Sequence, residues 1–318
     1  MVGSADGVPA LVRHAANRSL LAGQRQQLLA EISKYQNLLR NTHPGDGEAT
    51  HRTQYMQRLE NLQSALQGLD KVEAATADGQ GKYLLNIDSL AHGRGQVIIA
   101  SGNPDTAQHV MTTVPGTYSS LGDAMDYVQR GDAVMHRAEQ FAPNQSFASV
   151  TYVNYQAPDS LALAGMERWA DDGSKGLSQF QEGLRATHEG VAPSHNTVIG
   201  HSYGSTEVGF AARDHGLHAD DVVFIGSPGV GVEHANNLGM PPDHVWSGTA
   251  GLDEIKVARK LDPSDWDPSN DMWFGKNPSD PSFGGRQLPT GFWAGHSDYW
   301  DTKESFDGMA RIVAGKAG

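Results

Sequence analysis

From about Lys82 onward, short apolar runs alternate with longer segments of helical character. Several runs, such as QVIIAS at 96–101, are rich in Val and Ile and do not alternate with polar residues, which is typical of strands covered on both faces. This alternation predicts an α/β fold with a mostly parallel sheet and helices on both faces. The candidate strands are 83–88, 96–101, 109–114, 146–153, 196–200, 220–226 and 243–248, and the helical stretches between them include 119–140, 159–188 and 205–215.

The first quarter of the chain has a different pattern. Between Asn17 and Gly79 there are few β-branched residues, whereas Leu, Gln, Arg and Glu, which favour helix, are frequent. Apolar residues recur at helical spacing on both sides of a loop-like segment at 41–50. We expect a helical hairpin within residues 1–80, packed on or appended to a main domain at 81–318. A role of these helices in docking a protein partner is the alternative.

Composition narrows the function classes. A formal net charge of −13 without a Lys- or Arg-rich stripe disfavours nucleic acid and anionic membrane surfaces as partners. The chain has no Cys, which excludes disulfides and thiolate catalysis. His215 and His218 lie in a turn without further obvious ligands, so we expect neither a metal nor another cofactor. There is no apolar h-region and no run of membrane-spanning length, so we expect a cytoplasmic location, with signal-independent export left open.

The motif Gly-His-Ser-Tyr-Gly at 200–204 stands between a buried strand and a helical segment. A serine on a sharp strand-to-helix turn needs small neighbours, and Gly200 and Gly204 flank Ser202 at the two required positions. Such a turn raises the hydroxyl above the C-terminal edge of the sheet. We therefore interpret Ser202 as a nucleophile, the alternative being an incidental serine in a Gly-rich turn.

A nucleophilic serine needs a base, because a free hydroxyl is a poor nucleophile at neutral pH. In this architecture the acid and then the histidine follow the serine along the chain. His296, in AGHSDYW, is the candidate base, and Asp253, after the last predicted strand, is the candidate acid. Glu233 is the runner-up acid. His201 adjoins the nucleophile but points the wrong way on a sharp turn, so we interpret it as structural.

An oxyanion hole needs two backbone N–H donors directed at the developing charge. We expect one from Tyr203, directly after the nucleophile, and the other from Thr117 or Tyr118 in the turn at 112–120. The long segment 262–294 is rich in Pro, Gly and aromatic residues, which predicts an ordered loop. Its aromatic residues either form a lid over the substrate pocket or only pack the loop; they include Trp266, Trp273, Phe274, Phe283 and Trp293.

Six segments of this chain resemble, in sequence and in order, an actinobacterial α/β-hydrolase family long labelled as a domain of unknown function (DUF1023). They are VPGT, GHSYGS, GSPGVGVEHA, VW…GLDEI, WFG and GHSDY. The resemblance covers about residues 80–315. The upstream helices, with Ala-Asn-Arg at 16–18, also resemble the segment that precedes this domain in the family.

The resemblance implies an α/β-hydrolase fold with Ser202 as nucleophile, His296 as base and Asp253 as acid, but it implies no substrate. Tyr118 stands where a glycine is expected in many relatives. The function that we expect is that of a serine hydrolase with a small-molecule or peptide acyl substrate: an ester, a peptide or amide, or a thioester. An acyltransferase or macrocyclase with the same acyl-enzyme stays open, as does a non-catalytic module that binds a partner on a hydrolase scaffold.

Overall fold

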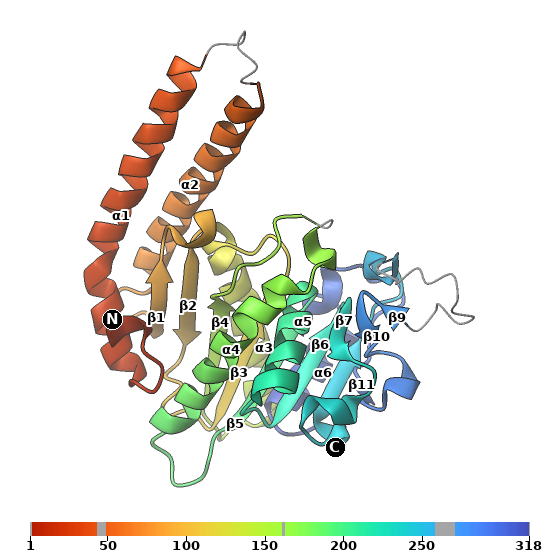
Figure 1. Cartoon of the computed structure of the whole chain (residues 1–318). Coiled ribbons are helices and arrows are strands. Elements are labelled where there is room, and N and C mark those ends of the chain that lie inside the picture. The colour runs from red at the N-terminus through yellow and green to blue at the C-terminus, as the bar shows by residue number, and fades with distance from the viewer. Residues whose placement is uncertain (1, 43–48, 161–162, 258–270, 318) are drawn as a thin grey trace.

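The computed structural model describes residues 2–42, 49–160, 163–257 and 271–317 of the chain. An eight-stranded sheet runs through the part that it describes, with helices on both faces (Figure 1). The sheet confirms the predicted fold class. Its strands, in spatial order, are β1 (Lys82–Asp88), β2 (Gln96–Ser101), β4 (Phe147–Val153), β3 (His109–Val114), β5 (His195–His201), β6 (Asp221–Ile225), β8 (Val245–Gly248) and β11 (Arg286–Gln287).

The sheet is parallel from β4 to β11 and antiparallel at its other end, where β2 pairs with both β1 and β4. The strands β3 and β6 are buried along their whole length, and four of the five residues of β6 form a continuous apolar run, as expected for a strand covered on both faces. The parallel strands bring their C-terminal ends to one edge. This edge carries the loops that contain the serine motif and its expected partners.

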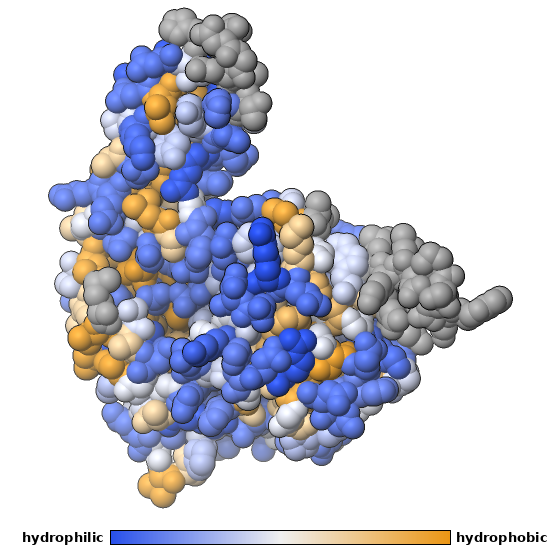
Figure 2. Space-filling view, in the orientation of Figure 1, coloured by the Kyte–Doolittle hydropathy of each residue, from blue (hydrophilic) through white to orange (hydrophobic). Residues whose placement is uncertain are grey.

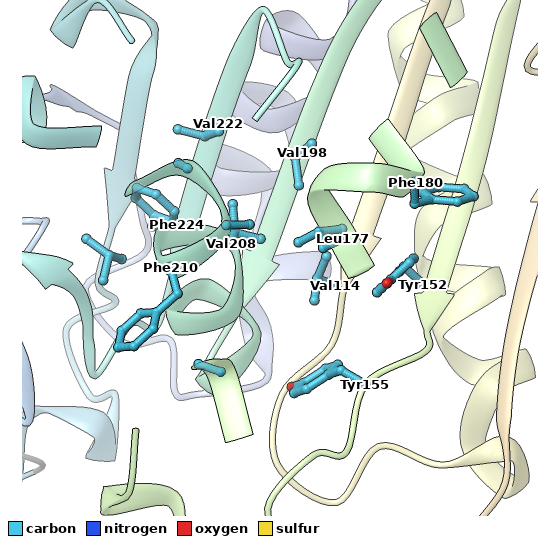
Figure 3. Packing of buried hydrophobic residues seen from close by; sticks show 14 of the residues in the cluster. Val114, Tyr152, Tyr155, Leu177, Phe180, Val198, Val208, Phe210, Val222 and Phe224 are labelled. Atoms are coloured by element: carbon cyan, nitrogen blue, oxygen red, sulfur yellow. The ribbon is translucent and has the colours of Figure 1, made fainter. Parts of the chain in front are cut away.

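Two pairs of helices cover the sheet. On one face α4 (Arg168–Thr187) and α5 (Tyr203–Phe210) pack on the large apolar cluster shown in Figure 3, in which Leu177 and Val208 lie near Val198 of β5. On the other face α3 (Ala124–Phe141) and α6 (Lys303–Val313) pack on a second cluster, which includes Ile199 of β5. Neighbouring residues of β5 thus face opposite sides, as the alternation of side chains along a strand requires.

Three short strands differ from the sequence-based expectation. β7 (Gly229–Val232), β10 (Phe274–Lys276) and β9 (Asp271–Met272) form a second sheet in that order. Of GSPGVG at 226–231, only the first three residues precede the strand, because β7 begins at Gly229. The described part of the expected loop 262–294 is likewise built into both sheets, because it supplies β9, β10 and β11.

The N-terminal helices form the predicted hairpin of α1 (Ala10–Asn41) and α2 (Ala49–Ala75). Leu28 of α1 and Leu69 of α2 are fully buried in a third apolar cluster, together with Leu84 of β1 and Leu121. The far end of the hairpin extends beyond the sheet (Figure 1), and its visible surface is mostly hydrophilic (Figure 2). Within the described ranges, no helix has the length and apolar character needed to cross a membrane.

Side chains of α1 also make hydrogen bonds to the backbone of β1. The Asn17 amide donates to the Leu84 carbonyl at 3.0 Å, and the Arg13 guanidinium donates to the Leu85 carbonyl at 2.9 Å. The Leu84 amide in turn donates to Nδ1 of His14 at 3.0 Å. The beginning of α1 is therefore joined to the sheet by polar contacts as well as by apolar packing.

Candidate active site

Ser202 lies on a sharp turn between β5 and α5. Its backbone has φ 55° and ψ −131°, a conformation that is strained for a residue with a side chain, and its amide donates to the Ile225 carbonyl at 2.9 Å. A Cβ at Gly200 would lie 2.5 Å from Cα of Ser205, and one at Gly204 would lie 2.2 Å from the Val114 carbonyl oxygen. Close packing therefore requires glycine at both flanking positions, as the motif predicts.

The Ser202 side chain lines a pocket of about 490 Å³ at the C-terminal edge of the sheet. The pocket is bordered by the loop after β3, by one side of α3 and by the segments around Glu254 and His296. Ser202 itself is 8% exposed. The sequence-predicted serine and histidine thus share one pocket although they are far apart in the chain.

Asp253 and His296 form a close pair beside this pocket. Nδ1 of His296 lies 2.8 Å from a carboxylate oxygen of Asp253, which is 2% exposed. The same carboxylate accepts hydrogen bonds from the Ile255 amide at 2.8 Å and from the Tyr299 hydroxyl. Burial acts to raise the pKa of Asp253, but the hydrogen bonds from His296 and Tyr299 and the nearby imidazole outweigh it, so this pKa is lowered. The aspartate therefore stays ionised and fixes the orientation of the ring.

Tyr299 is a residue whose role the sequence analysis missed. Its hydroxyl accepts a hydrogen bond from the Ala250 amide at 2.9 Å and donates one to Asp253. Tyr299 is fully buried. The signal for it was its place in the GHSDY segment, three residues after His296, but only the tertiary contacts show what it binds.

Gly226, at the end of β6, is a second residue that was missed. It has φ 55°, and a Cβ there would lie 2.9 Å from Oδ2 of Asp253 and 3.0 Å from Nδ1 of His296. Any side chain at this position would disturb the acid–base pair. The glycine is therefore part of the site although it contributes no functional group.

His201 contacts the backbone of the candidate base. Its Nε2 donates to the His296 carbonyl at 2.8 Å, and the two imidazole rings lie 4.9 Å apart between centroids. Burial, together with the nearby His296, lowers the pKa of His201 to about 3, so the ring is neutral at physiological pH. These contacts support the interpretation of His201 as structural, because they hold the loop that carries His296.

Ser202 and His296 are not joined by a hydrogen bond in the part of the chain that the structure describes. Both side chains line the same pocket. Hydrogen bonds between a nucleophile and its base are often long in the free enzyme and tighten in the substrate complex. The contact between Asp253 and His296 is thus already formed, and a triad needs only the hydrogen bond between Ser202 and His296 in addition.

The loop after β3 lies directly against the serine turn. A Cβ at Gly116 would lie 2.7 Å from Cβ of Ser202 and 3.0 Å from the Tyr203 amide nitrogen. The Tyr118 amide is already engaged, because it donates to the Pro158 carbonyl at 3.0 Å. Of the two expected donors in this loop, only Thr117 therefore has a free amide within the described structure. Tyr118 has φ 69°, which explains why a glycine is expected there.

Three other sequence-predicted residues lie away from the serine pocket. The runner-up acid Glu233 is exposed and lines a separate pocket of about 220 Å³ together with Trp273 and Phe274. Phe274 is 2% exposed and packs its ring against Tyr203, at 5.7 Å between centroids. Glu233 is thus not the partner of His296, and Phe274 belongs to the core and is not part of a lid.

The other aromatic residues of the expected lid have different surroundings. Trp273 is partly buried against the main core, and Phe283 is 1% exposed. Trp293 is 79% exposed, with its ring against Phe292. Trp266 lies outside the described residues. Of these side chains, only Trp293 stays a candidate contact for a substrate, because it precedes His296 by three residues.

Among the residues that the structure describes, no three His, Asp or Glu side chains gather in the way that metal ligands do.

The fold and this site define an α/β hydrolase. A family model described as alpha/beta hydrolase matches residues 91–263, which is more than half of the chain. The chain belongs to this family, and the resemblance that the sequence segments indicated is confirmed.

Several curated relatives are similar in sequence. An uncharacterized protein of Mycobacterium tuberculosis H37Rv is 30% identical over 268 residues, which cover 82% of this chain and 41% of that protein. A second uncharacterized protein of the same strain is 34% identical over 174 residues, which cover 52% of this chain and 65% of that protein. The chain therefore spans less than half the length of the first relative and about two thirds of the second.

Solved structures with a similar fold include esterases of low sequence identity. The crystal structure of esterase PE8 is 14% identical and has a TM-score of 0.42, and the match covers 65% of this chain and 92% of that one. A cold-adapted esterase from an Arctic intertidal metagenomic library is 12% identical with a TM-score of 0.44, and the match covers 76% and 96% of the two chains.

Proposed function

We propose that the protein is a serine hydrolase that cleaves an acyl substrate through an acyl-enzyme formed on Ser202. The observation that carries this proposal is the hydrogen bond between His296 and the buried Asp253, beside the same pocket as a serine on a strained strand-to-helix turn. A serine, a histidine and a buried aspartate in this chain order are the parts of a nucleophilic triad.

In the proposed reaction, Oγ of Ser202 attacks the carbonyl carbon of the substrate while Nε2 of His296 accepts the hydroxyl proton. Asp253 accepts the hydrogen bond from Nδ1 and stabilises the imidazolium that forms. The amides of Tyr203 and Thr117 donate to the oxyanion. His296 returns the proton to the departing alcohol or amine, and the same steps with water release the acid and restore Ser202.

A carboxylic ester is the first substrate class that we propose, and a peptide or amide is the second. An alkoxide or phenoxide is a better leaving group than an amide nitrogen. We therefore expect a triad whose serine and histidine are not hydrogen-bonded in the free protein to cleave esters faster than amides. The family assignment and the site geometry support hydrolase chemistry in general.

Labelling by a fluorophosphonate tests this proposal. We expect intact-mass analysis of the wild-type protein to show one covalent adduct, and the Ser202→Ala variant to show none. Ser297→Ala is the matched control, because Ser297 lines the same pocket and is exposed, and it should label like wild type. An unlabelled wild-type protein with an intact fold, or a labelled Ser202→Ala variant, would contradict the proposal.

A further inference from the structure

Arg130 of α3 lines the same pocket as Ser202 and His296. Its side chain is half-buried, and its guanidinium carbon lies 5.8 Å from the centroid of the Tyr127 ring. The charge of Arg130 contributes to the lowered pKa of the buried His201. Arg130 therefore places a positive charge at the wall of the site.

This cation has no ion pair and no hydrogen bond to the residues that the structure describes. Many other arginines of the chain pair with carboxylates, as expected for a protein with 37 acidic and 24 basic residues. They are Arg13, Arg25, Arg94, Arg137, Arg185 and Arg213. An arginine that lacks such a partner and faces a pocket is available to a ligand.

The other charged side chains of the pocket restrict the charge of the group that Arg130 can bind. Asp123 accepts a hydrogen bond from the Ser120 hydroxyl at 2.7 Å, and Glu254 is exposed at the border of the pocket. These two carboxylates repel a dianion such as a phosphate monoester more strongly than a monoanion. The planar guanidinium also matches the two oxygens of a carboxylate.

We propose that Arg130 binds a carboxylate of the substrate, so that the enzyme prefers esters that carry a carboxylate in either the acyl or the alcohol portion. This inference rests on the proposed function, because it assigns the substrate class of the same site. Arg130 takes no part in bond making. It sets the specificity and the position of the substrate.

Two pairs of esters test the proposal. The first pair is 4-nitrophenyl hemiglutarate and 4-nitrophenyl valerate, which differ by a carboxylate at the end of the acyl chain. The second is 4-carboxyphenyl valerate and 4-carbamoylphenyl valerate, which differ in the charge of the leaving group. For at least one pair, we expect Arg130→Gln to lower the ratio of kcat/KM for the charged over the neutral ester by about tenfold or more, the effect of losing a charge-assisted hydrogen bond.

Arg311→Gln is the matched control. Arg311 on α6 is exposed, lies over the Phe141 ring and is not among the residues that line the pocket. It removes the same charge and should leave the ratio at its wild-type value. Arg130→Lys keeps the charge without the planar fork and should show an intermediate ratio. It also serves as the second variant if Arg130→Gln does not fold.

A binding measurement separates this inference from the proposed function. We expect calorimetry to show that the hemiglutarate ester binds the Ser202→Ala protein and that the added Arg130→Gln change weakens this binding about tenfold or more. If wild type cleaves the esters but no ratio depends on Arg130, the inference is wrong and the hydrolase proposal stands. If no ester is cleaved, the proposed preference for esters is wrong, and calorimetry decides on Arg130: equal binding with and without Arg130, or no binding, overturns the inference.

Discussion

Among single residues, Tyr299 provides the clearest test of the proposed catalysis, because its hydroxyl contacts Asp253. Tyr299→Phe removes a hydrogen bond to the carboxylate and leaves those from His296 and the Ile255 amide. Because the substrate does not contact Tyr299 directly in the proposed reaction, we expect kcat to fall about tenfold and KM to stay near its wild-type value. Steady-state kinetics on a 4-nitrophenyl ester measure both.

Thermal melting of the Tyr299→Phe variant shows whether its fold is intact. A kcat equal to that of wild type would mean that the Asp253 orientation does not depend on Tyr299. A fall in kcat that merely follows a loss of folded protein would also contradict a positioning role.

At the scale of the element, α5 is buried at every position from Tyr203 to Phe210 and contains an acid, Glu207. Neither carboxyl oxygen of Glu207 has a hydrogen-bond partner in the described structure. Burial, followed by the nearby Asp172, raises the pKa of Glu207 well above its ordinary value. The folded protein therefore keeps this proton in a pH range in which the unfolded chain releases it.

Because the folded protein retains this proton, its stability depends on pH. Below the ordinary carboxyl pKa, the contribution of the Glu207 proton to the free energy of unfolding is fully present. As pH rises toward the folded-state pKa it is lost, at up to about 1.4 kcal/mol per pH unit. We expect the free energy of unfolding of Glu207→Gln, relative to wild type, to increase between pH 5 and pH 7. Urea unfolding at several pH values measures it, and a difference that is independent of pH would contradict the protonated state.

For the whole molecule, the question is whether the hairpin and the α/β domain unfold together. We propose that they form one cooperative unit, because Leu28 and Leu69 share an apolar cluster with β1 and β2. All six tryptophans of the chain follow residue 80, so tryptophan fluorescence reports on the α/β domain alone.

Two neighbouring leucines of α1 provide the test. Leu28 is 0% exposed and Leu29 is 49% exposed. We expect Leu28→Ala to lower the free energy of unfolding, followed by tryptophan fluorescence in urea, by about 2–5 kcal/mol. Leu29→Ala should change it by less than about 0.5 kcal/mol. An unchanged fluorescence transition for Leu28→Ala would mean that the hairpin is a separate unit.

The fold was predictable where the pattern is local. Strands such as β2 and β6 contain continuous apolar runs, and the flanking glycines of Ser202 indicate a tight turn, so both features could be identified from neighbouring residues. The strands that the prediction missed, β7, β9, β10 and β11, have two to four residues each and no periodicity, and the pairs β7–β10 and β8–β11 join segments that are distant in the chain.

The candidate site was predictable where chain order restricts it. Ser202, Asp253 and His296 follow from the order of a nucleophile, an acid and a base. Glu233 and Phe274 were misplaced, because sequence does not tell which side of a loop a carboxylate occupies or whether an aromatic ring belongs to a core or to a lid. Tyr299 and Gly226 act through contacts between distant segments, which no local pattern reports.

The hydrogen bonds from α1 to Leu84 and Leu85 have a consequence for self-association. β1 is the outermost strand at one end of the sheet, and an open edge strand is a template on which another chain can add a strand of its own. Side chains of α1 occupy part of that template. At the opposite end, β11 offers only two residues. The described molecule is thus protected at both ends against edge-to-edge aggregation, and a variant that lost α1 would lose this protection at β1.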